Sequence, residues 1–337
     1  MRIGIPAYRL PRKVLDDEIN MVKKLGVEIK TNTKVDSLDS LFQQGYQAIL
    51  VAVGAWEGMK LGVEGENHPN VIDCITFLRG VSLGKPVKLG NRVIVVGGGN
   101  AAIDSARTAL RLGSKDVTIL YRRTRKEMPA SEYEVEEALH EGVKIEFLAA
   151  PTRVLSKDGA ISLEAIRMKL GAPDASGRPR PEPIAGSEFR IDCDAVVAAI
   201  GQRPEIPKQF ELKTQKGNVL ETDAKTLATS RPGVFAAGDV VTGPASVIKA
   251  IADGKQAAVS IDKYLGGEGI LKVEPIEIIE PTSRHTYRER SVKKEPPEAP
   301  AIPPSQRISN FDEVELGLTE EIAIAEGQRC WRCDLEQ

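Results

Sequence analysis

Residues 92–113 read RVIVVGGGNAAIDSARTALRLG, and this stretch decides the fold. RVIVV (92–96) is a short, largely β-branched run, typical of a strand that is buried on both faces. The glycine run 97–99 follows, and 101–112 has the apolar spacing of a helix that ends at Gly113. The order of strand, glycine-rich turn and helix predicts the first unit of an α/β domain.

Strand and helix patterns alternate on both sides of this unit, which predicts a doubly wound parallel sheet. We expect helices at 13–25, 131–142 and 246–265, strands at 27–35, 48–53, 116–121, 143–148, 161–170 and 188–200, and a polar loop rich in Pro and Gly at 171–183. The segments 48–58 and 195–205 resemble each other, since both are apolar strands that end at glycine and then turn. Two related nucleotide-binding lobes would explain this weak repeat.

The composition excludes several classes of protein. Of the 337 residues 41% are apolar, enough for two domains with cores of their own. The 46 Lys and Arg balance 48 Asp and Glu, and aromatic residues make up 4%, so nothing favours nucleic-acid binding. No apolar run is long enough for a membrane span, and the N-terminus lacks a signal peptide. Four cysteines are too few for a disulfide scaffold, so we expect a cytoplasmic protein.

The turn after the first strand fits G-x-G-x-x-A, a form of the dinucleotide-binding fingerprint. Gly97 makes the tight turn, Gly99 lets a pyrophosphate approach the backbone, and Ala102 lets the helix lie close to the sheet. The N–H groups at the helix start then bind the anion. The candidate cofactor-binding residues of this turn are Gly97, Gly98, Gly99, Asn100, Ala101 and Ala102. The alternative is a glycine-rich turn with no ligand.

The end of the next strand distinguishes between NAD and NADP. NAD-specific folds place a carboxylate there, whereas this chain has Arg122 and Arg123 in the basic run 121–126. Guanidinium groups bind a 2′-phosphate, often through two hydrogen bonds at once. The sequence therefore predicts NADP; the alternative is that the basic run is a solvated loop.

A second motif lies at 229–240, where an apolar strand runs into Gly238 and Asp239. An aspartate at a strand end, beside a helix start, can hold a hydroxyl of a polyol. Two further candidate cofactor-binding residues are Gly201, after the strand 188–200, and Ser246, at the start of the helix 246–265.

With these motifs the chain resembles the NADPH-dependent small (beta) subunit of glutamate synthase and its flavoprotein relatives with two dinucleotide-binding domains. The resemblance covers residues 1 to 265 and is carried by GIPAYRLP (4–11) and by 95–113, 121–130 and 233–258. It implies two Rossmann-like domains, with an NADP domain (86–202) inserted into an FAD domain (1–85 and 203–268). A Pro-rich linker and CxxC tail follow at 269–337.

The resemblance also implies roles for single residues. The aspartate that matches Asp239 holds the ribityl chain of the flavin, and the segment that matches Gly4–Leu10 lies near the flavin. Relatives begin their FAD domain with a strand, GxGxxG and a helix upstream of GIPAYRLP, whereas this sequence starts at that point. The FAD site is therefore expected to be incomplete unless a partner or a missing segment completes it.

The remaining cysteines and histidines carry weaker expectations. Cys330 and Cys333 form a CxxC, half of a four-cysteine iron–sulfur site. Shared ligation of a 4Fe–4S cluster with a partner, a tail with free thiols and a redox dithiol all stay open. We expect Cys74 and Cys193 to be buried and the three histidines, His68, His140 and His285, to lie at the surface.

Together these features predict a flavoprotein oxidoreductase subunit that passes electrons from NADPH through FAD to an iron–sulfur or flavoprotein partner, as in glutamate synthase. No catalytic side chain is assigned, because the cofactor supplies the chemistry. The alternative is a non-catalytic NADP-binding or scaffold subunit, or a gene fragment, that cannot hold FAD alone.

Overall fold

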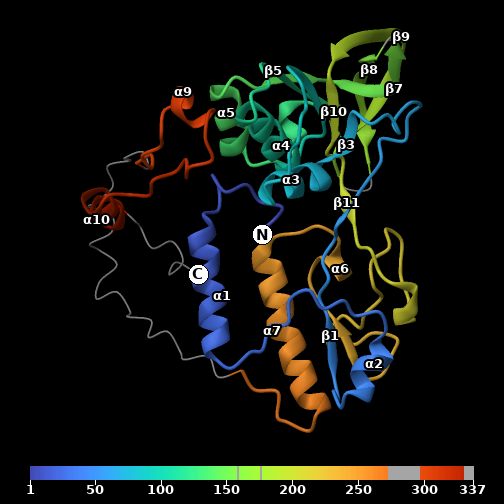
Figure 1. Cartoon of the computed structure of the whole chain (residues 1–337), viewed down its shortest axis with the longest axis vertical. Coiled ribbons are helices and arrows are strands. Elements are labelled where there is room, and N and C mark those ends of the chain that lie inside the picture. The colour runs from blue at the N-terminus through green and yellow to red at the C-terminus, as the bar shows by residue number, and fades with distance from the viewer. Residues whose placement is uncertain (158, 175–176, 272–296, 330–337) are drawn as a thin grey trace.

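The chain folds into two lobes that are joined by a narrow crossing (Figure 1). The computed structural model describes residues 1–157, 159–174, 177–271 and 297–329. We call the upper lobe of Figure 1, which contains residues 59–200, the five-stranded lobe, and the lower one the β1–β12 lobe. Among the described residues, no helix combines the length and the apolar character that crossing a bilayer requires.

The five-stranded lobe is built on a parallel sheet with the strand order β3-β10-β4-β5-β6. Its strands are β3 (Val71–Asp73), β4 (Arg92–Val96), β5 (Asp116–Tyr121), β6 (Lys144–Phe147) and β10 (Ala195–Ala198). The strand order reverses direction between β4 and β10, and in open α/β sheets ligands bind at such a switch point. The parallel sheet predicted from the sequence is confirmed, and so is the β4–helix–β5–helix–β6 order.

The two faces of this sheet are covered differently. Val93 and Val95 pack against the helices α3 (Cys74–Ser82), α4 (Asn100–Arg111) and α5 (Glu132–His140), which lie on one face. Ile94 and Val96 point to the other face and pack against a three-stranded antiparallel sheet. That sheet consists of β7 (Ala149–Lys157), β8 (Ala160–Pro173) and β9 (Pro179–Cys193). Each residue of β4 after the first is therefore buried, as its unbroken apolar run predicts.

The prediction of a polar loop at 171–183 is wrong for most of these residues. Residues 171–173 continue β8 and residues 179–183 begin β9. The prolines of β9 are tolerated because β9 is the edge strand of its sheet.

The β1–β12 lobe has a two-stranded parallel sheet in the described part of the chain. Its strands are β1 (Ile49–Val51) and β12 (Val234–Ala236), and its helices are α1 (Arg12–Lys24), α2 (Leu38–Gln43), α6 (Asp239–Thr242) and α7 (Val247–Tyr264). Leu38, Phe210 and Leu220 complete its core around the two strands. The prediction of a strand at 27–35 is wrong. These residues form turns and irregular chain, and the side chains of Val27 and Ile29 are about half exposed.

The crossing between the lobes is made by the two segments that the weak sequence repeat singled out. After β1 the chain enters β2 (Glu57–Gly58), and after β10 it enters β11 (Gln202–Arg203). These short strands pair antiparallel, and the Arg203 guanidinium donates to both Glu57 carboxylate oxygens at 2.7 and 2.6 Å. Because β3 and α3 already belong to the five-stranded lobe, the first crossing lies near residue 58 and not at the expected boundary of 85/86.

Residues 300–317 form a C-terminal arm that lies along the five-stranded lobe (Figure 1). Arg307, at the end of α9 (Pro304–Arg307), and Val314 are buried, and the Val314 N–H donates to the Tyr8 carbonyl at 3.1 Å. This part of the chain is thus docked, although the sequence predicts a linker there. The described part of the chain ends in α10 (Glu320–Arg329), with Thr319 capping it. Residues 272–296 of the predicted linker lie outside the described residues.

Candidate functional site

The glycine turn joins β4 to α4 at the carboxyl edge of the parallel sheet. Gly97 has φ +147°, and a Cβ there would lie 2.2 Å from the Ala199 carbonyl oxygen. A Cβ on Gly98 would lie 2.4 Å from the Tyr121 ring. Two different neighbours therefore exclude side chains from the turn: the end of β10 and the end of β5.

Gly99 differs from the two glycines before it, because space is left open beside it. It is the N-cap of α4 and offers no side-chain cap, and the nearest atom to a Cβ there is Pro129 Cγ at 3.8 Å. Within the described chain, the N–H groups of residues 98–101 donate to no protein acceptor. Unpaired N–H groups at a helix start, with open space before them, are the features that bind a pyrophosphate.

The turn is held from the other side by the chain that leads into α5. The Ala130 N–H donates to the Gly98 carbonyl at 3.1 Å. The Asn100 side-chain oxygen accepts from the Ser131 N–H, also at 3.1 Å. Asn100 therefore contributes its backbone N–H to the site, while its side chain fixes the start of α5. Ala102 is fully buried where α4 meets the sheet, the place that its small side chain predicts.

Gly201 lies across the switch point from this turn. It follows β10, has φ +137°, and its carbonyl accepts from the Met59 N–H at 3.0 Å. Residues 199–201 thus form the wall of the site next to Gly97 and lead directly into the crossing between the lobes.

Arg122 and Arg123 follow β5 but lie in different surroundings. Arg122 is exposed, whereas Arg123 is 3% exposed. The Arg123 guanidinium donates to Asp174 Oδ2 at 2.6 Å and to the Pro179 carbonyl at 2.8 Å. In this structure Arg123 therefore joins the basic loop to the β8–β9 hairpin, and Arg122 presents its charge at the surface.

The second motif, Gly238 and Asp239, lies in the β1–β12 lobe, directly after β12. Gly238 has φ +74°, and Asp239 begins α6, where its Oδ1 accepts from the Ala245 N–H at 3.2 Å. Ser246 is the N-cap of α7, with its hydroxyl accepting from the Lys249 N–H at 3.2 Å. The Ser246 side chain is thus engaged in capping, and the backbone around it is what remains for a cofactor.

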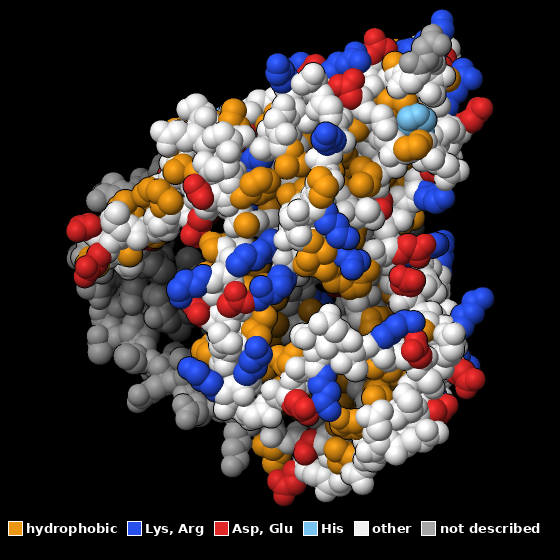
Figure 2. Space-filling view, in the orientation of Figure 1, with side chains coloured by type: hydrophobic (Ala, Val, Ile, Leu, Met, Phe, Trp, Pro, Cys, Tyr) orange, Lys and Arg blue, Asp and Glu red, His pale blue; other side chains and the backbone are white. Residues whose placement is uncertain are grey.

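The two motifs belong to different lobes, and the molecule is hollowed between them. Figure 2 shows a recess near the middle of the molecule, with Lys and Arg side chains around it. Gly97 belongs to the five-stranded lobe, Gly201 follows directly after that lobe, and Gly238 and Asp239 belong to the β1–β12 lobe. The described residues provide no second glycine-rich strand–helix turn for an FAD pyrophosphate.

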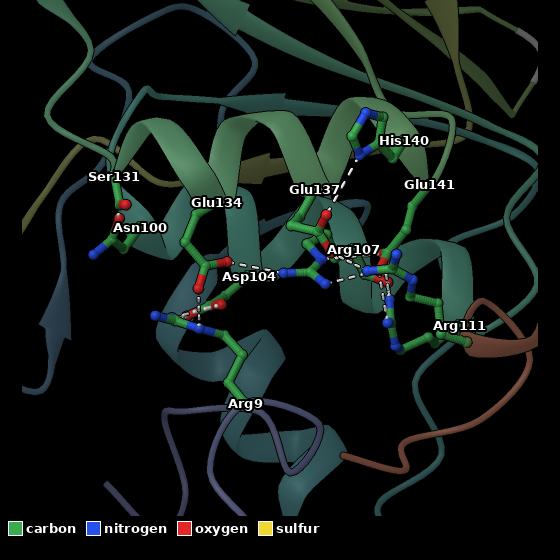
Figure 3. A network of polar contacts seen from close by, with 11 residues as sticks. Arg9, Asn100, Asp104, Arg107, Arg111, Ser131, Glu134, Glu137, His140 and Glu141 are labelled. Atoms are coloured by element: carbon green, nitrogen blue, oxygen red, sulfur yellow. Dashed lines mark hydrogen bonds and ion pairs between the residues drawn. The ribbon is translucent and has the colours of Figure 1, made fainter. Parts of the chain in front are cut away.

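A buried charge cluster, which the sequence did not single out, lies on the outer side of α4 and α5 (Figure 3). Arg107, 2% exposed, donates to Glu134 at 2.8 Å and to Glu141 at 2.7 and 3.1 Å. Arg111 also donates to both Glu141 oxygens, at 2.6 and 3.0 Å. Burial raises the pKa of Glu141, but hydrogen bonds from Arg111 and Arg107 outweigh it and hold the pKa below its usual range. The spacing of Asp104, Arg107 and Arg111, which places them on one helix face, is the signal that could have revealed the cluster.

The cysteines and histidines mostly follow expectation. Cys74 and Cys193 are buried free thiols, and burial raises the pKa of each, to about 12 and about 11. His140 is exposed and His68 is partly exposed. Cys330, Cys333 and His285 lie outside the described residues. Elsewhere in the described chain, no group of three or more His, Cys, Asp and Glu side chains could hold a metal ion.

Comparison with known proteins agrees with this geometry. The profile of the pyridine nucleotide-disulphide oxidoreductase family matches residues 15–254. The chain is 41% identical to the NADP(+)-dependent formate dehydrogenase subunit beta of Moorella thermoacetica, over 99% of this chain and 49% of the relative. It is 38% identical to the NADPH-Fe(3+) oxidoreductase subunit beta of Geobacter sulfurreducens, over 98% of this chain and 55% of the relative.

The glutamate synthase [NADPH] small chain of Azospirillum brasilense is 37% identical, over 77% of this chain and 58% of the relative. The chain therefore spans about half the length of these curated relatives. Among solved structures, FprA of Mycobacterium tuberculosis in complex with NADPH has a similar fold, with a TM-score of 0.65 at 18% identity over 79% of this chain and 74% of FprA.

Proposed function

The chain belongs to the pyridine nucleotide-disulphide oxidoreductase family, and on that premise we propose that it is the NADPH-binding part of a flavoprotein oxidoreductase. In this proposal it passes electrons from NADPH through FAD to an iron–sulfur partner. The observation that carries the proposal is the turn 97–102, whose N–H groups at residues 98–101 are unpaired beside the open space at Gly99. The names of the relatives, which include NADPH-dependent oxidoreductase subunits, support it.

The NADPH site of the proposal runs along the carboxyl edge of the sheet. The turn 97–102 holds the pyrophosphate, and Arg122 contacts the 2′-phosphate from the end of β5. Gly201, at the switch point, lies on the path from the pyrophosphate toward the β1–β12 lobe. The nicotinamide end then faces Gly238 and Asp239, which hold the flavin. Bound FAD supplies the conversion of hydride transfer into single-electron transfer, and the protein positions the two cofactors.

The described residues provide only part of a flavin site. Asp239 fits a ribityl hydroxyl, but the β1–β12 lobe leaves apolar side chains uncovered. Those on α1 and α7 with more than half of their surface exposed are Val14, Met21, Ile248, Ile251 and Tyr264. We expect further polypeptide, from a longer chain or from a partner, to cover them and to complete the FAD site. Cys330 and Cys333 would supply two ligands of a shared 4Fe–4S cluster.

A second candidate function is a non-catalytic NADP-binding or scaffold subunit. The two-stranded sheet of the β1–β12 lobe in the described residues favours it, since that sheet offers FAD no pyrophosphate cradle. The flavin content of the protein distinguishes the two functions.

The basic loop gives a direct test of the NADPH assignment. Replacing Arg122 by Ala, alone or together with Arg123→Ala, is expected to weaken NADPH binding much more than NADH binding. A hydrogen bond to a charged group contributes about 1.5–3 kcal/mol, so the expected loss of NADPH affinity is about 10- to 100-fold per contact. The dissociation constants of both nucleotides, measured by titration calorimetry, check this.

A matched control is Lys115→Ala. Lys115 is exposed and precedes β5, so it lies at the opposite edge of the sheet from the basic loop. This variant should bind both nucleotides as the unmodified protein does. Equal losses for NADPH and NADH in the Arg122 variant would show that the loop does not read the 2′-phosphate.

A further inference from the structure

The basic loop, residues 121–130, starts and ends against the glycine turn. At its start, a Cβ on Gly98 would lie 2.4 Å from the Tyr121 ring, and the Tyr121 hydroxyl donates to the Glu127 carbonyl at 2.6 Å. At its end, the Ala130 N–H donates to the Gly98 carbonyl at 3.1 Å. Both ends of the loop are therefore fixed relative to the turn that the proposed function assigns to the pyrophosphate.

The middle of the loop is held by local hydrogen bonds, with one arginine left over. The Thr124 N–H and hydroxyl both donate to Glu127 Oε2, which forms a capping box. The Arg123 carbonyl accepts from the Leu148 N–H at 3.1 Å. Arg122, in contrast, is exposed, and its side chain makes no hydrogen bond or ion pair with the described residues. Its charge is thus available to a ligand.

The side chain of Arg123 fastens the loop to the β8–β9 hairpin. This buried guanidinium donates through Nε to the Pro179 carbonyl at 2.8 Å and through Nη2 to Asp174 Oδ2 at 2.6 Å. Asp174 directly follows β8 and Pro179 begins β9. The Asp174 N–H donates to the Arg178 carbonyl at 2.8 Å, which closes the hairpin. The two hydrogen bonds of Arg123 therefore go to opposite sides of one hairpin end.

The hairpin is a firm support because its base belongs to a core. Leu163 and Ala165 of β8 are fully buried in the cluster that covers one face of the five-stranded sheet. From there β8 stays paired with β9 as far as Pro173, which lies opposite Pro179. Proline restricts the backbone, so the end of the hairpin that meets Arg123 is stiff.

Arg123 depends on Asp174 for its place in the interior. Removing one partner of a buried ion pair leaves the other charge without compensation, which is strongly unfavourable. Without Asp174 we therefore expect the Arg123 guanidinium to turn toward water. Arg122 is the preceding residue, so its backbone would move with this change.

We propose that Asp174 is a positioning residue that determines the preference for NADPH over NADH: through Arg123 it holds the basic loop so that Arg122 faces the 2′-phosphate. This inference rests on the proposed function, which places NADPH on the turn 97–102. Asp174 itself touches no nucleotide. It fixes the loop before the nucleotide arrives and so removes the ordering cost that a mobile arginine would add to binding.

A different role for the same ion pair makes the opposite prediction. If Arg123 itself took the 2′-phosphate, the Asp174 carboxylate would compete with that phosphate for the guanidinium. Removing Asp174 would then strengthen NADPH binding, whereas a positioning role requires that it weaken NADPH binding. The sign of the change distinguishes the two roles.

The test measures the dissociation constants of NADPH and NADH for Asp174→Ala, Arg122→Ala and the double variant, each in the full chain. Asp174→Ala should weaken NADPH about 10-fold, the effect of losing one well-placed charged contact, and leave NADH nearly unchanged. The double variant should bind NADPH no more weakly than Arg122→Ala alone, because Asp174 acts through Arg122. Asp174→Glu should recover part of the affinity.

Glu182→Gln is the matched control. Glu182 lies on β9 of the same hairpin and pairs with Lys169 at the surface, so this variant should bind both nucleotides as the unmodified protein does. Tighter NADPH binding by Asp174→Ala would overturn the proposal, and so would equal losses for NADPH and NADH. Additive losses in the double variant would also overturn it, because Asp174 would then act independently of Arg122.

The position of the loop is measured separately and without nucleotide, from the mobility of a spin label at Lys126→Cys in a Cys330→Ser, Cys333→Ser background. Lys126 is exposed in the basic loop, and Cys74 and Cys193 are buried. Asp174→Ala should make the label more mobile, and an unchanged spectrum would overturn the proposal. If the unmodified protein binds neither nucleotide, the proposed function fails, while the label still decides whether Asp174 holds the loop.

Discussion

The Arg107→Ala variant is expected to unfold with a free energy about 3–5 kcal/mol lower than the unmodified chain, the usual effect of removing one partner of a buried ion pair. Arg107 is 2% exposed and neutralises both Glu134 and Glu141, which are themselves buried. Its loss also removes one of the two cation–π contacts to Tyr8. The variant therefore weakens α4, α5 and the segment Gly4–Pro11 at once.

Urea denaturation followed by far-UV circular dichroism measures this loss. Arg153→Ala is the control, because its pair with Glu164 is exposed on the arginine side and should contribute far less to stability than a buried pair. If Arg107→Ala and Arg153→Ala have the same unfolding midpoint, the buried cluster does not stabilise the fold in the way that its geometry indicates.

The glycine turn gives the second large effect. Gly99→Ala is expected to leave the fold intact, since φ is −95° and the new Cβ meets its nearest neighbour at 3.8 Å. The methyl group would fill the space in front of the free N–H groups, where the pyrophosphate approaches. Losing one or two charge-assisted hydrogen bonds of about 1.5–3 kcal/mol each should weaken NADPH and NADH alike, by about 10-fold to about 10,000-fold or more.

Substitutions of two further glycines serve as controls for Gly99→Ala. Gly97→Ala should disrupt the turn itself, because its φ is +147° and its Cβ would lie 2.2 Å from a backbone oxygen. Gly254→Ala, in the middle of α7 with no atom within 4 Å of the new Cβ, should bind NADPH normally and gain about 0.5–1 kcal/mol of stability. Nucleotide affinity and melting temperature are measured for all three. Normal affinity in Gly99→Ala would show that no pyrophosphate binds at this turn.

The sequence predicts the five-stranded lobe well because its strands are buried on both faces. The run 92–96 alternates between two cores, and an unbroken apolar run is the signature of that situation. The glycine turn was equally predictable, since Gly97 and Gly98 are each required by a neighbour that the strand order brings close. By contrast, alternation at 27–35 predicts a strand, yet an alternating segment becomes a strand only where another strand pairs with it, and no strand among the described residues does so.

What the sequence could not predict depends on contacts between distant segments. The glutamates of α5 read as a solvated helix face, but Arg107, Arg111 and Arg307 from elsewhere in the chain bury them. Arg122 and Arg123 are adjacent and chemically identical. Their different surroundings follow from the β8–β9 hairpin, which brings Asp174 to one of them. The prolines of the C-terminal arm indicate an extended linker, and only the docking of Arg307 and Val314 shows that the arm belongs to the folded lobe.

The visible absorption spectrum of the natively purified protein, recorded before and after anaerobic addition of NADPH, tests the central claim most directly. The account predicts flavin bands that bleach on addition of NADPH, with this chain or a co-purifying partner completing the FAD site. A colourless protein that still binds NADPH would contradict the oxidoreductase proposal and favour the non-catalytic NADP-binding subunit.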